Sequence, residues 1–220
     1  MKREHEVTRL EAFSDAVFAF AATLLVVSLE VPASFAELVR ALSGFAPFAL
    51  SFGALCAIWS VHNAYFRRYG LQDRTTIALT CGLLFVVLFY VFPLKFLTRA
   101  IVAGFFGIGR EELAPMGGQE LAQLFELYGA GFVAVFACVA LMYAHAARVA
   151  RSLELSARRL HEARMLARHY GIFCLVGGLS MALAATGVGL RFGAPGWIYA
   201  LIGPLAGWHG AWSGRHRPAA

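Results

Sequence analysis

Apolar stretches of about 20 residues, separated by short polar segments, account for most of this 220-residue sequence. A helix rises about 1.5 Å per residue, so about 20 apolar residues cross the ~30 Å hydrocarbon core of a bilayer. Only 15% of the residues are charged, whereas a soluble domain carries roughly 25%. The pattern therefore predicts an all-α integral membrane protein and excludes an ordinary soluble domain.

Six transmembrane helices are predicted within a single transmembrane domain that covers residues 1–220. The predicted spans are residues 11–29, 46–66, 75–97, 121–147, 170–190 and 195–212. No internal repeat is found, so each chain is expected to contribute one copy of every span.

Three segments outside these spans also carry predictions. A short helix is expected at 34–42, with Ser34 as its N-cap and Glu37 three residues later. The segment 98–120 is rich in glycine and mildly apolar, which predicts a re-entrant or interfacial stretch. The segment 148–169 is charged and amphipathic, and it is predicted to be a cytosolic helical extension of the fourth and fifth spans.

Lysine and arginine residues are distributed unequally between the two sides of the predicted membrane. The side that holds both termini carries 14 of the 19 basic residues, and the opposite side carries 5. Short loops rich in Lys and Arg remain in the cytoplasm, so both termini are predicted to be cytoplasmic, with the protein in the plasma membrane. The net charge of +6 thus reflects orientation in a lipid bilayer and does not indicate nucleic-acid binding.

The first span contains polar residues that an apolar helix would not need. Arg9, Ser14 and Asp15 lie toward its cytosolic end. Charge inside a span is costly, and such groups usually face protein or water and find partners. One interpretation is local: Arg9 serves as an orientation signal and Ser14 bonds back to its own helix. The other is that Asp15 is held by polar groups of neighbouring helices.

The second span offers partners for Asp15. Trp59, His62 and Asn63 lie near its cytosolic end, at the same predicted depth. Trp59 is also typical of an interfacial aromatic belt, and His62 of a helix end in contact with water. The match in depth favours a packed polar network between the first two spans.

These residues carry a family resemblance. Residues 9–15, RLEAFSD, resemble the R-x-x-x-F-S-D signature of the transmembrane protein 175 family of potassium channels. The similarity continues through FAFAATLLV, the W-x-x-H-N of Trp59 to Asn63, Asp73 and Pro93. It covers about the first 95 residues with motifs.

The resemblance implies a function and an assembly. Six-span subunits of this kind form a homotetramer, and the first helix of each lines a central pore. Potassium is the permeating ion and is selected or preferred without a TVGYG filter, at a hydrophobic constriction. No cofactor and no metal other than permeating K⁺ are implied. A structural polar network would fix the first helix, formed by Arg9, Phe13, Ser14, Asp15, Trp59, His62, Asn63 and Asp73.

Family correspondence places the constriction five residues after the aspartate of the motif, at Phe20. Helical spacing places Phe13, Leu24 and Val27 on the same face, with Thr23 beside it. The alternative is that this stripe packs against other helices of the chain. Relatives usually carry Ile or Leu at the position of Phe20, so a ring of phenylalanines here is a departure from the family pattern.

Three other functions compete with a channel. A secondary transporter for a small ion or solute is favoured by the Gly/Pro interruption GPLAG at 203–207, although no inverted repeat is visible. An enzyme is disfavoured because no HExxH, GxSxG or P-loop motif occurs. A structural or assembly role in the membrane is the third. The four cysteines lie in apolar stretches without a CxxC motif, which predicts buried free thiols and not disulfides or metal ligands.

Overall fold

The computed structural model describes residues 7–27, 33–109, 113–150 and 155–216, and these residues form helices and turns without a β-strand. The prediction of an all-α fold is therefore confirmed. The chain divides into two compact units, residues 1–67 with 84–115 and residues 68–83 with 116–220. The single six-helix domain stays a prediction.

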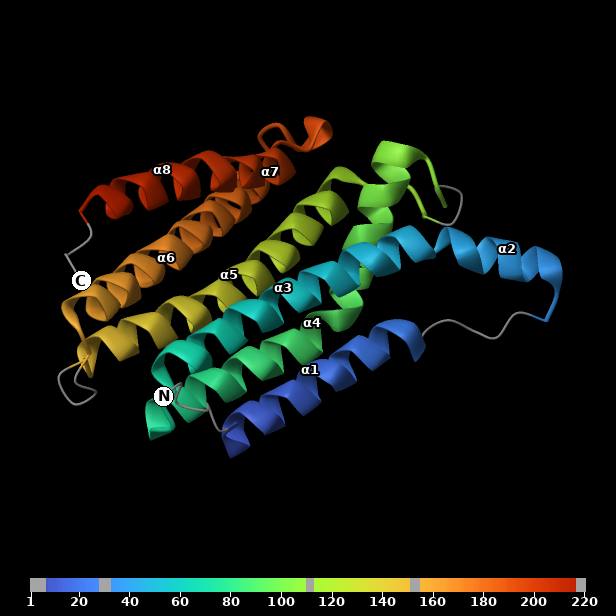
Figure 1. The fold of residues 1–220 in the computed structure, drawn as a ribbon. Coiled ribbons are helices and arrows are strands. Elements are labelled where there is room, and N and C mark those ends of the chain that lie inside the picture. Colours follow the sequence, from blue (N-terminus) through green and yellow to red (C-terminus); the bar gives the residue numbers. More distant parts are fainter. Residues whose placement is uncertain (1–6, 28–32, 110–112, 151–154, 217–220) are drawn as a thin grey trace. The chain divides into compact units, whose positions relative to one another are not determined.

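The first unit contains α1 (Arg9–Val27), α2 (Phe35–Ser43), most of α3 (Phe45–Tyr69) and the later part of α4 (Arg74–Phe106). These helices can be followed in Figure 1. The predicted short helix is confirmed as α2, and the Ser34 side chain accepts a hydrogen bond from the Glu37 amide. The last two residues of the first predicted span, 28 and 29, lie outside the described residues.

A reciprocal cap begins α1. The Glu11 amide donates to Thr8 Oγ1 at 3.2 Å, and the Thr8 amide donates to Glu11 Oε2 at 2.8 Å. This is a capping box, which satisfies two backbone donors at the helix start. The start of the candidate pore helix is thus fixed by its own sequence.

The helix α4 is longer than predicted. The predicted span ended at residue 97, and a re-entrant or interfacial stretch was expected at 98–120, but the helix continues past Pro93 to Phe106. Residues 98–106 are therefore helical, because a proline can kink a helix without ending it. The position of the segment 98–120 relative to the membrane stays a prediction. Thr98 is buried and its hydroxyl lies 2.7 Å from that of Ser51 on α3. The helix is followed by Gly107 with φ of 70°.

The second unit is organised by α5 (Gly118–Arg148) and α6 (Ala157–Thr186), which form its most extensive helix pair. Glycines allow the close approach. A Cβ at Gly129 would lie 2.3 Å from Met181 Cγ, and one at Gly177 would lie 2.7 Å from Val133 Cγ2. Small residues at such crossings let membrane helices pack closely.

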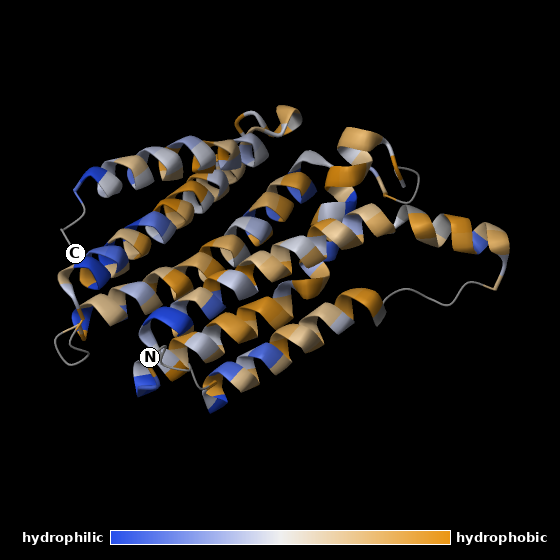
Figure 2. Cartoon of the chain, viewed as in Figure 1, coloured by the Kyte–Doolittle hydropathy of each residue, from blue (hydrophilic) through white to orange (hydrophobic). Residues whose placement is uncertain are grey.

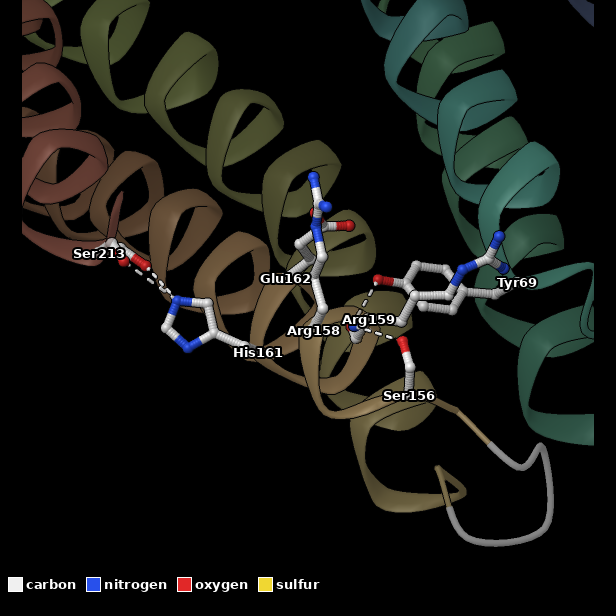
Figure 3. Close-up of polar contacts among 7 residues, drawn as sticks. All are labelled: Tyr69, Ser156, Arg158, Arg159, His161, Glu162 and Ser213. Atoms are coloured by element: carbon white, nitrogen blue, oxygen red, sulfur yellow. Dashed lines mark hydrogen bonds and ion pairs between the residues drawn. The ribbon is translucent and has the colours of Figure 1, made fainter. Parts of the chain in front are cut away.

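Polar contacts hold the start of α6 (Figure 3). Ser156 caps the helix by accepting from the Arg159 amide at 3.3 Å. Arg159 Nη1 donates to the Arg68 carbonyl at 2.8 Å, and Tyr69 Oη donates to the Arg159 carbonyl at 3.4 Å. His161 Nε2 lies 3.0 Å from Ser213 Oγ on α8.

The predicted continuous helix over 148–169 is wrong. The helix α5 ends at Arg148 and α6 begins at Ala157, because Ser156 offers a cap at which a new helix starts. Residues 151–154 lie outside the described part of the chain. The helical extension of the fifth span over 157–169 is as expected.

The end of the chain is less regular than one span. The helix α6 stops at Thr186, and Gly187 follows with φ of 72°. The chain continues through η2 (Leu190–Phe192), α7 (Ala194–Trp197), η3 (Ile198–Leu201) and α8 (Ile202–Arg215). The predicted sixth span thus covers a change from 3₁₀ to α geometry. A Pro–Gly pair, which begins at Pro195, lies near the start of this span and precedes the change.

Four helices of the described residues, α3, α4, α5 and α6, are long and apolar enough to cross a membrane. In Figure 2, α4 is hydrophobic over most of its length, whereas hydrophilic residues gather at the start of α6. The prediction of a membrane protein is supported by these four helices. The first and last of the six predicted spans are not among them, so the number of six remains a prediction.

Candidate functional site

The helix α1 has one face buried against its own unit and one face open. The buried positions follow helical spacings of three and four residues, and they are Glu11, Ser14, Phe18, Ala21 and Leu25, each 0–8% exposed. Phe13 and Phe20 lie on the opposite side and are each 56% exposed. The helix therefore packs along a single stripe, and Phe20 is not part of it.

The other predicted pore residues lie near Phe20 on the helix surface. Thr23 is exposed, and its hydroxyl donates to the Ala19 carbonyl at 3.0 Å. Leu24 is half-buried. Val27 is the last residue of α1, and its side chain lies outside the described part of the structure. The alternative that the whole stripe packs within the chain finds no support at Phe13, Phe20 or Thr23.

Asp15 is held by the second predicted span. Trp59 Nε1 donates a hydrogen bond of 2.7 Å to Asp15 Oδ1, which joins α1 to α3. Tryptophan is a donor only, and a carboxylate is the strongest acceptor available to it. The structure thus brings together these two members of the predicted network.

Three other members on α1 behave differently. Ser14 is fully buried but bonds back to the Leu10 carbonyl at 2.7 Å, which is the local interpretation of the sequence. Arg9 is exposed, and within the described residues its side chain makes no ion pair with Asp15. Phe13 lies on the open face, with the candidate pore residues.

A cavity of about 270 Å³ lies between the start of α1 and the later part of α3. Its lining residues are Val7, Glu11, Asp15, His62, Asn63 and Arg67. His62 is 2% exposed, and its ring lies 5.7 Å from that of Phe18 and 4.8 Å from that of Phe66. Its Nε2 has no hydrogen-bond partner among the described residues. The cavity therefore groups Asp15, His62 and Asn63, and their packed polar network stays a prediction.

The cavity also contains two residues that sequence analysis missed. Glu11 lies there because it caps α1, and the signal was the spacing T-x-x-E from Thr8 to Glu11. Arg67 lies one turn after Asn63 on α3. A basic residue four positions from a polar network residue shares its helix face, which could have indicated this neighbour.

Asp73 belongs to the second unit, where its partners are on α4 and α5. Its Oδ1 accepts from the Thr76 hydroxyl at 2.6 Å and the Thr76 amide at 3.3 Å, so it caps the start of α4. Its Oδ2 lies 2.7 Å from Nε2 of His145. Desolvation raises the pKa of Asp73, but the hydrogen bonds from Thr76 and His145 together lower it below its ordinary value. Sequence analysis did not identify His145.

The described residues contain no group of three or more His, Cys, Asp or Glu side chains that could hold a metal ion. The four cysteines, all among the described residues, are free as predicted, but none is buried, because Cys81 is exposed and the other three are half-buried. The helix α1 thus combines an exposed apolar face with an end that is held by the hydrogen bond between Asp15 and Trp59.

Comparisons with known proteins point in one direction. The family described as "Endosomal/lysosomal potassium channel TMEM175" matches residues 9–90. A potassium channel of Marivirga tractuosa is 39% identical over 187 residues, which are 82% of this chain and 76% of the relative. A potassium channel of Chamaesiphon minutus is 27% identical over 201 residues, which are 86% of this chain and 91% of the relative.

Solved structures agree with these relatives. A crystal structure of a variant of the potassium channel MtTMEM175, bound to a nanobody–MBP fusion, has a TM-score of 0.85 and 34% identity. That match covers 97% of this chain and 96% of the other. A lysosomal potassium-selective channel TMEM175 homologue from Chamaesiphon minutus matches with a TM-score of 0.60 and 24% identity, over 94% and 98% of the chains. At that identity the second match speaks for the fold alone.

Proposed function

Since this chain belongs to the TMEM175 family of potassium channels, we propose that α1 forms a hydrophobic constriction through which potassium passes in preference to sodium. The resemblance found in residues 9–15 is confirmed by the family match. The family and the relatives are ion channels, so the chain is a membrane channel and not an enzyme, and K⁺ is its permeant ion.

One observation carries the proposal. Phe20 is 56% exposed on a helix whose opposite face is buried at 0–8% exposure. A helix that packs along one stripe leaves its other face for lipid, another chain or a pore. The family correspondence selects the pore for this face.

A pore on this face requires several chains, because each chain carries one copy of α1. We infer a cyclic homotetramer about an axis normal to the membrane, with six spans per subunit and both termini in the cytoplasm. The asymmetry of 14 to 5 basic residues supports this orientation. The plasma membrane is the proposed location.

In this assembly Phe20, Leu24 and Val27 form successive apolar rings. Seven residues separate the first ring from the last, which corresponds to roughly 10 Å of helix. Such a narrow apolar stretch loses water easily and gates by dewetting or steric closure. An ion that passes through it loses hydration, so the more weakly hydrated K⁺ is favoured over Na⁺, with a modest ratio.

The polar residues then serve the pore indirectly. Asp15 is bonded to Trp59 on the flank of α1, about 140° around the helix from Phe20. It therefore orients α1 and does not face the permeating ion. His62 and Asn63 line the cavity beside it.

The decisive experiment replaces Phe20 by Asn in purified protein reconstituted into planar bilayers. Under a K⁺/Na⁺ gradient, Phe20→Asn raises the single-channel current and weakens discrimination between K⁺ and Na⁺. Phe105 is 69% exposed near the end of α4, and Phe105→Asn is the matched control that changes neither. Unchanged conductance and selectivity in Phe20→Asn would remove α1 from the pore.

Two further measurements separate the remaining alternatives. Native mass spectrometry in mild detergent should show tetramers, and a spectrum with only monomers or dimers would contradict the assembly. Flux that saturates with substrate and depends on a counter-ion would instead favour the secondary transporter.

A further inference from the structure

The last turn of α1 carries two of the four proposed pore residues, Leu24 and Val27, and it is the end of the helix opposite the Asp15 anchor. This turn contains no basic residue of its own. The last four carbonyls of a helix have no partner within it, and they form the negative end of the helix dipole. A cation near this turn would stabilise it.

Lys95 of α4 supplies that cation within the same unit. Its Nζ donates to the Leu25 carbonyl at 3.3 Å, and the side chain is half-buried. Leu25 itself is 1% exposed, so its side chain already faces the interior of the unit. The Lys95 ammonium thus contacts the backbone carbonyl of the residue that follows Leu24.

The position of Lys95 on α4 is fixed by buried polar contacts. The Thr98 hydroxyl lies 3.0 Å from the Lys95 carbonyl and 2.7 Å from the Ser51 hydroxyl of α3. The Ser51 hydroxyl also lies 2.9 Å from the Pro47 carbonyl, so the two hydroxyl hydrogens are shared among three contacts. Ser51 and Thr98 are 0% and 5% exposed, so these bonds are shielded from water. Together they hold α4 against α3 at the level of Lys95.

We propose that Lys95 caps the C-terminal end of α1 and thereby positions the second half of the constriction. The proposal rests on the proposed function in so far as α1 lines the pore. Asp15 with Trp59 fixes one end of this helix, and Lys95 fixes the other. Lys95 is a positioning residue, because it acts through the backbone of Leu25 and does not touch the permeating ion.

Arg99 provides a matched control for charge. It lies one turn further along α4 and is exposed. Removal of either side chain deletes one positive charge from the same region of the subunit. The removal of Lys95 also deletes its hydrogen bond to the Leu25 carbonyl.

The test is hydrogen exchange of the full chain in lipid nanodiscs, followed by mass spectrometry of peptides from α1. Lys95→Met should speed exchange at residues 24–27 about two- to five-fold, the size expected for loss of a cation at a helix end. Exchange at residues 9–14 should not change. Lys95→Arg should restore the original rate, and Arg99→Met should leave it unaltered.

Two results would overturn the cap: equal exchange in Lys95→Met and the unmodified protein, or equal acceleration in Lys95→Met and Arg99→Met. If Lys95→Met fails to assemble, the comparison is repeated with Lys95→Gln and Arg99→Gln, and the same criterion applies. The Phe20→Asn current decides the pore assignment separately. If the exchange test contradicts the Lys95 cap but Phe20→Asn alters the current, the proposed function stands. If the exchange test supports the cap but Phe20→Asn has no effect, only the pore assignment is refuted.

Discussion

Trp59 Nε1 and Asp15 Oδ1, 2.7 Å apart, form a hydrogen bond that joins the candidate pore helix α1 to α3. A hydrogen bond to a charged acceptor is shorter and stronger than a neutral one. Because Asp15 lies on the flank between the buried and open faces, this bond restricts rotation of α1 about its own axis. The same restriction keeps Phe20 on the open face.

Removing either partner of this bond should weaken the protein without altering ion preference. Asp15→Ala should damage folding or assembly, and Trp59→Phe should lower the free energy of unfolding by about 1.5 kcal/mol, the low end for a hydrogen bond to a charged group because this bond is exposed to water. Thermal unfolding in detergent and native mass spectrometry measure the two effects. The double variant should lose less than the sum of the single losses. Normal tetramers of Asp15→Ala with altered ion selectivity would instead place Asp15 in the permeation path.

The glycine pair on α6 offers a clean comparison in the second unit. A Cβ on Gly177 would lie 2.7 Å from Val133 Cγ2 and 3.1 Å from Phe132 Cδ1, whereas one on Gly178 has no atom within 4 Å. Overpacking costs typically 1–3 kcal/mol. Gly177→Ala should therefore lower the melting temperature, and Gly178→Ala should leave it equal or raise it, because alanine favours a helix. Equal destabilisation by both substitutions would show that α5 and α6 are not in this close contact.

The sequence could predict the apolar helices because membrane spans depend on local composition. It could also predict that Asp15 bonds with α3, since Trp59 stands at the same depth. Helix ends were predicted less well. The predicted span ended at residue 97, yet the helix α4 contains Pro93 and continues to Phe106. A proline can kink a helix without ending it, so the residue type alone does not fix the helix end.

Close contacts between helices could not be predicted from glycine spacing alone. The sequence contains two GxxxG pairs, Gly203 with Gly207 and Gly210 with Gly214, and this spacing predicts close helix contacts in a tetramer. Within the described chain a Cβ at any of these four positions meets no atom within 4 Å, and the close approach occurs at Gly129 and Gly177 instead. A contact of the GxxxG pairs with another copy remains a prediction. Likewise, the Asp73–His145 contact joins residues 72 positions apart and has no local signature.

Acid should destabilise the second unit through Asp73. Its pKa in the folded protein lies below the ordinary value of 3.8, because the hydrogen bonds from Thr76 and His145 together outweigh desolvation. A carboxyl of this kind contributes its full stability above the unfolded-state pKa and loses it as the pH falls through the folded-state pKa. Between about pH 5 and pH 3, the melting temperature of the unmodified protein should therefore fall more than that of Asp73→Asn. Parallel curves for the two proteins would contradict this role.

The hydroxyl of Thr23 is the polar group nearest the proposed constriction. Its hydrogen is used in the 3.0 Å bond to the Ala19 carbonyl, so an oxygen lone pair remains to face a partly dehydrated cation. Thr23→Val keeps the shape and removes this oxygen, and it should lower the K⁺ current and reduce the preference for K⁺ over Na⁺. Thr23→Ser keeps the oxygen and should resemble the unmodified channel. Single-channel recording under a K⁺/Na⁺ gradient compares them, and identical currents in Thr23→Val and Thr23→Ser would mean that the apolar rings alone set the selectivity.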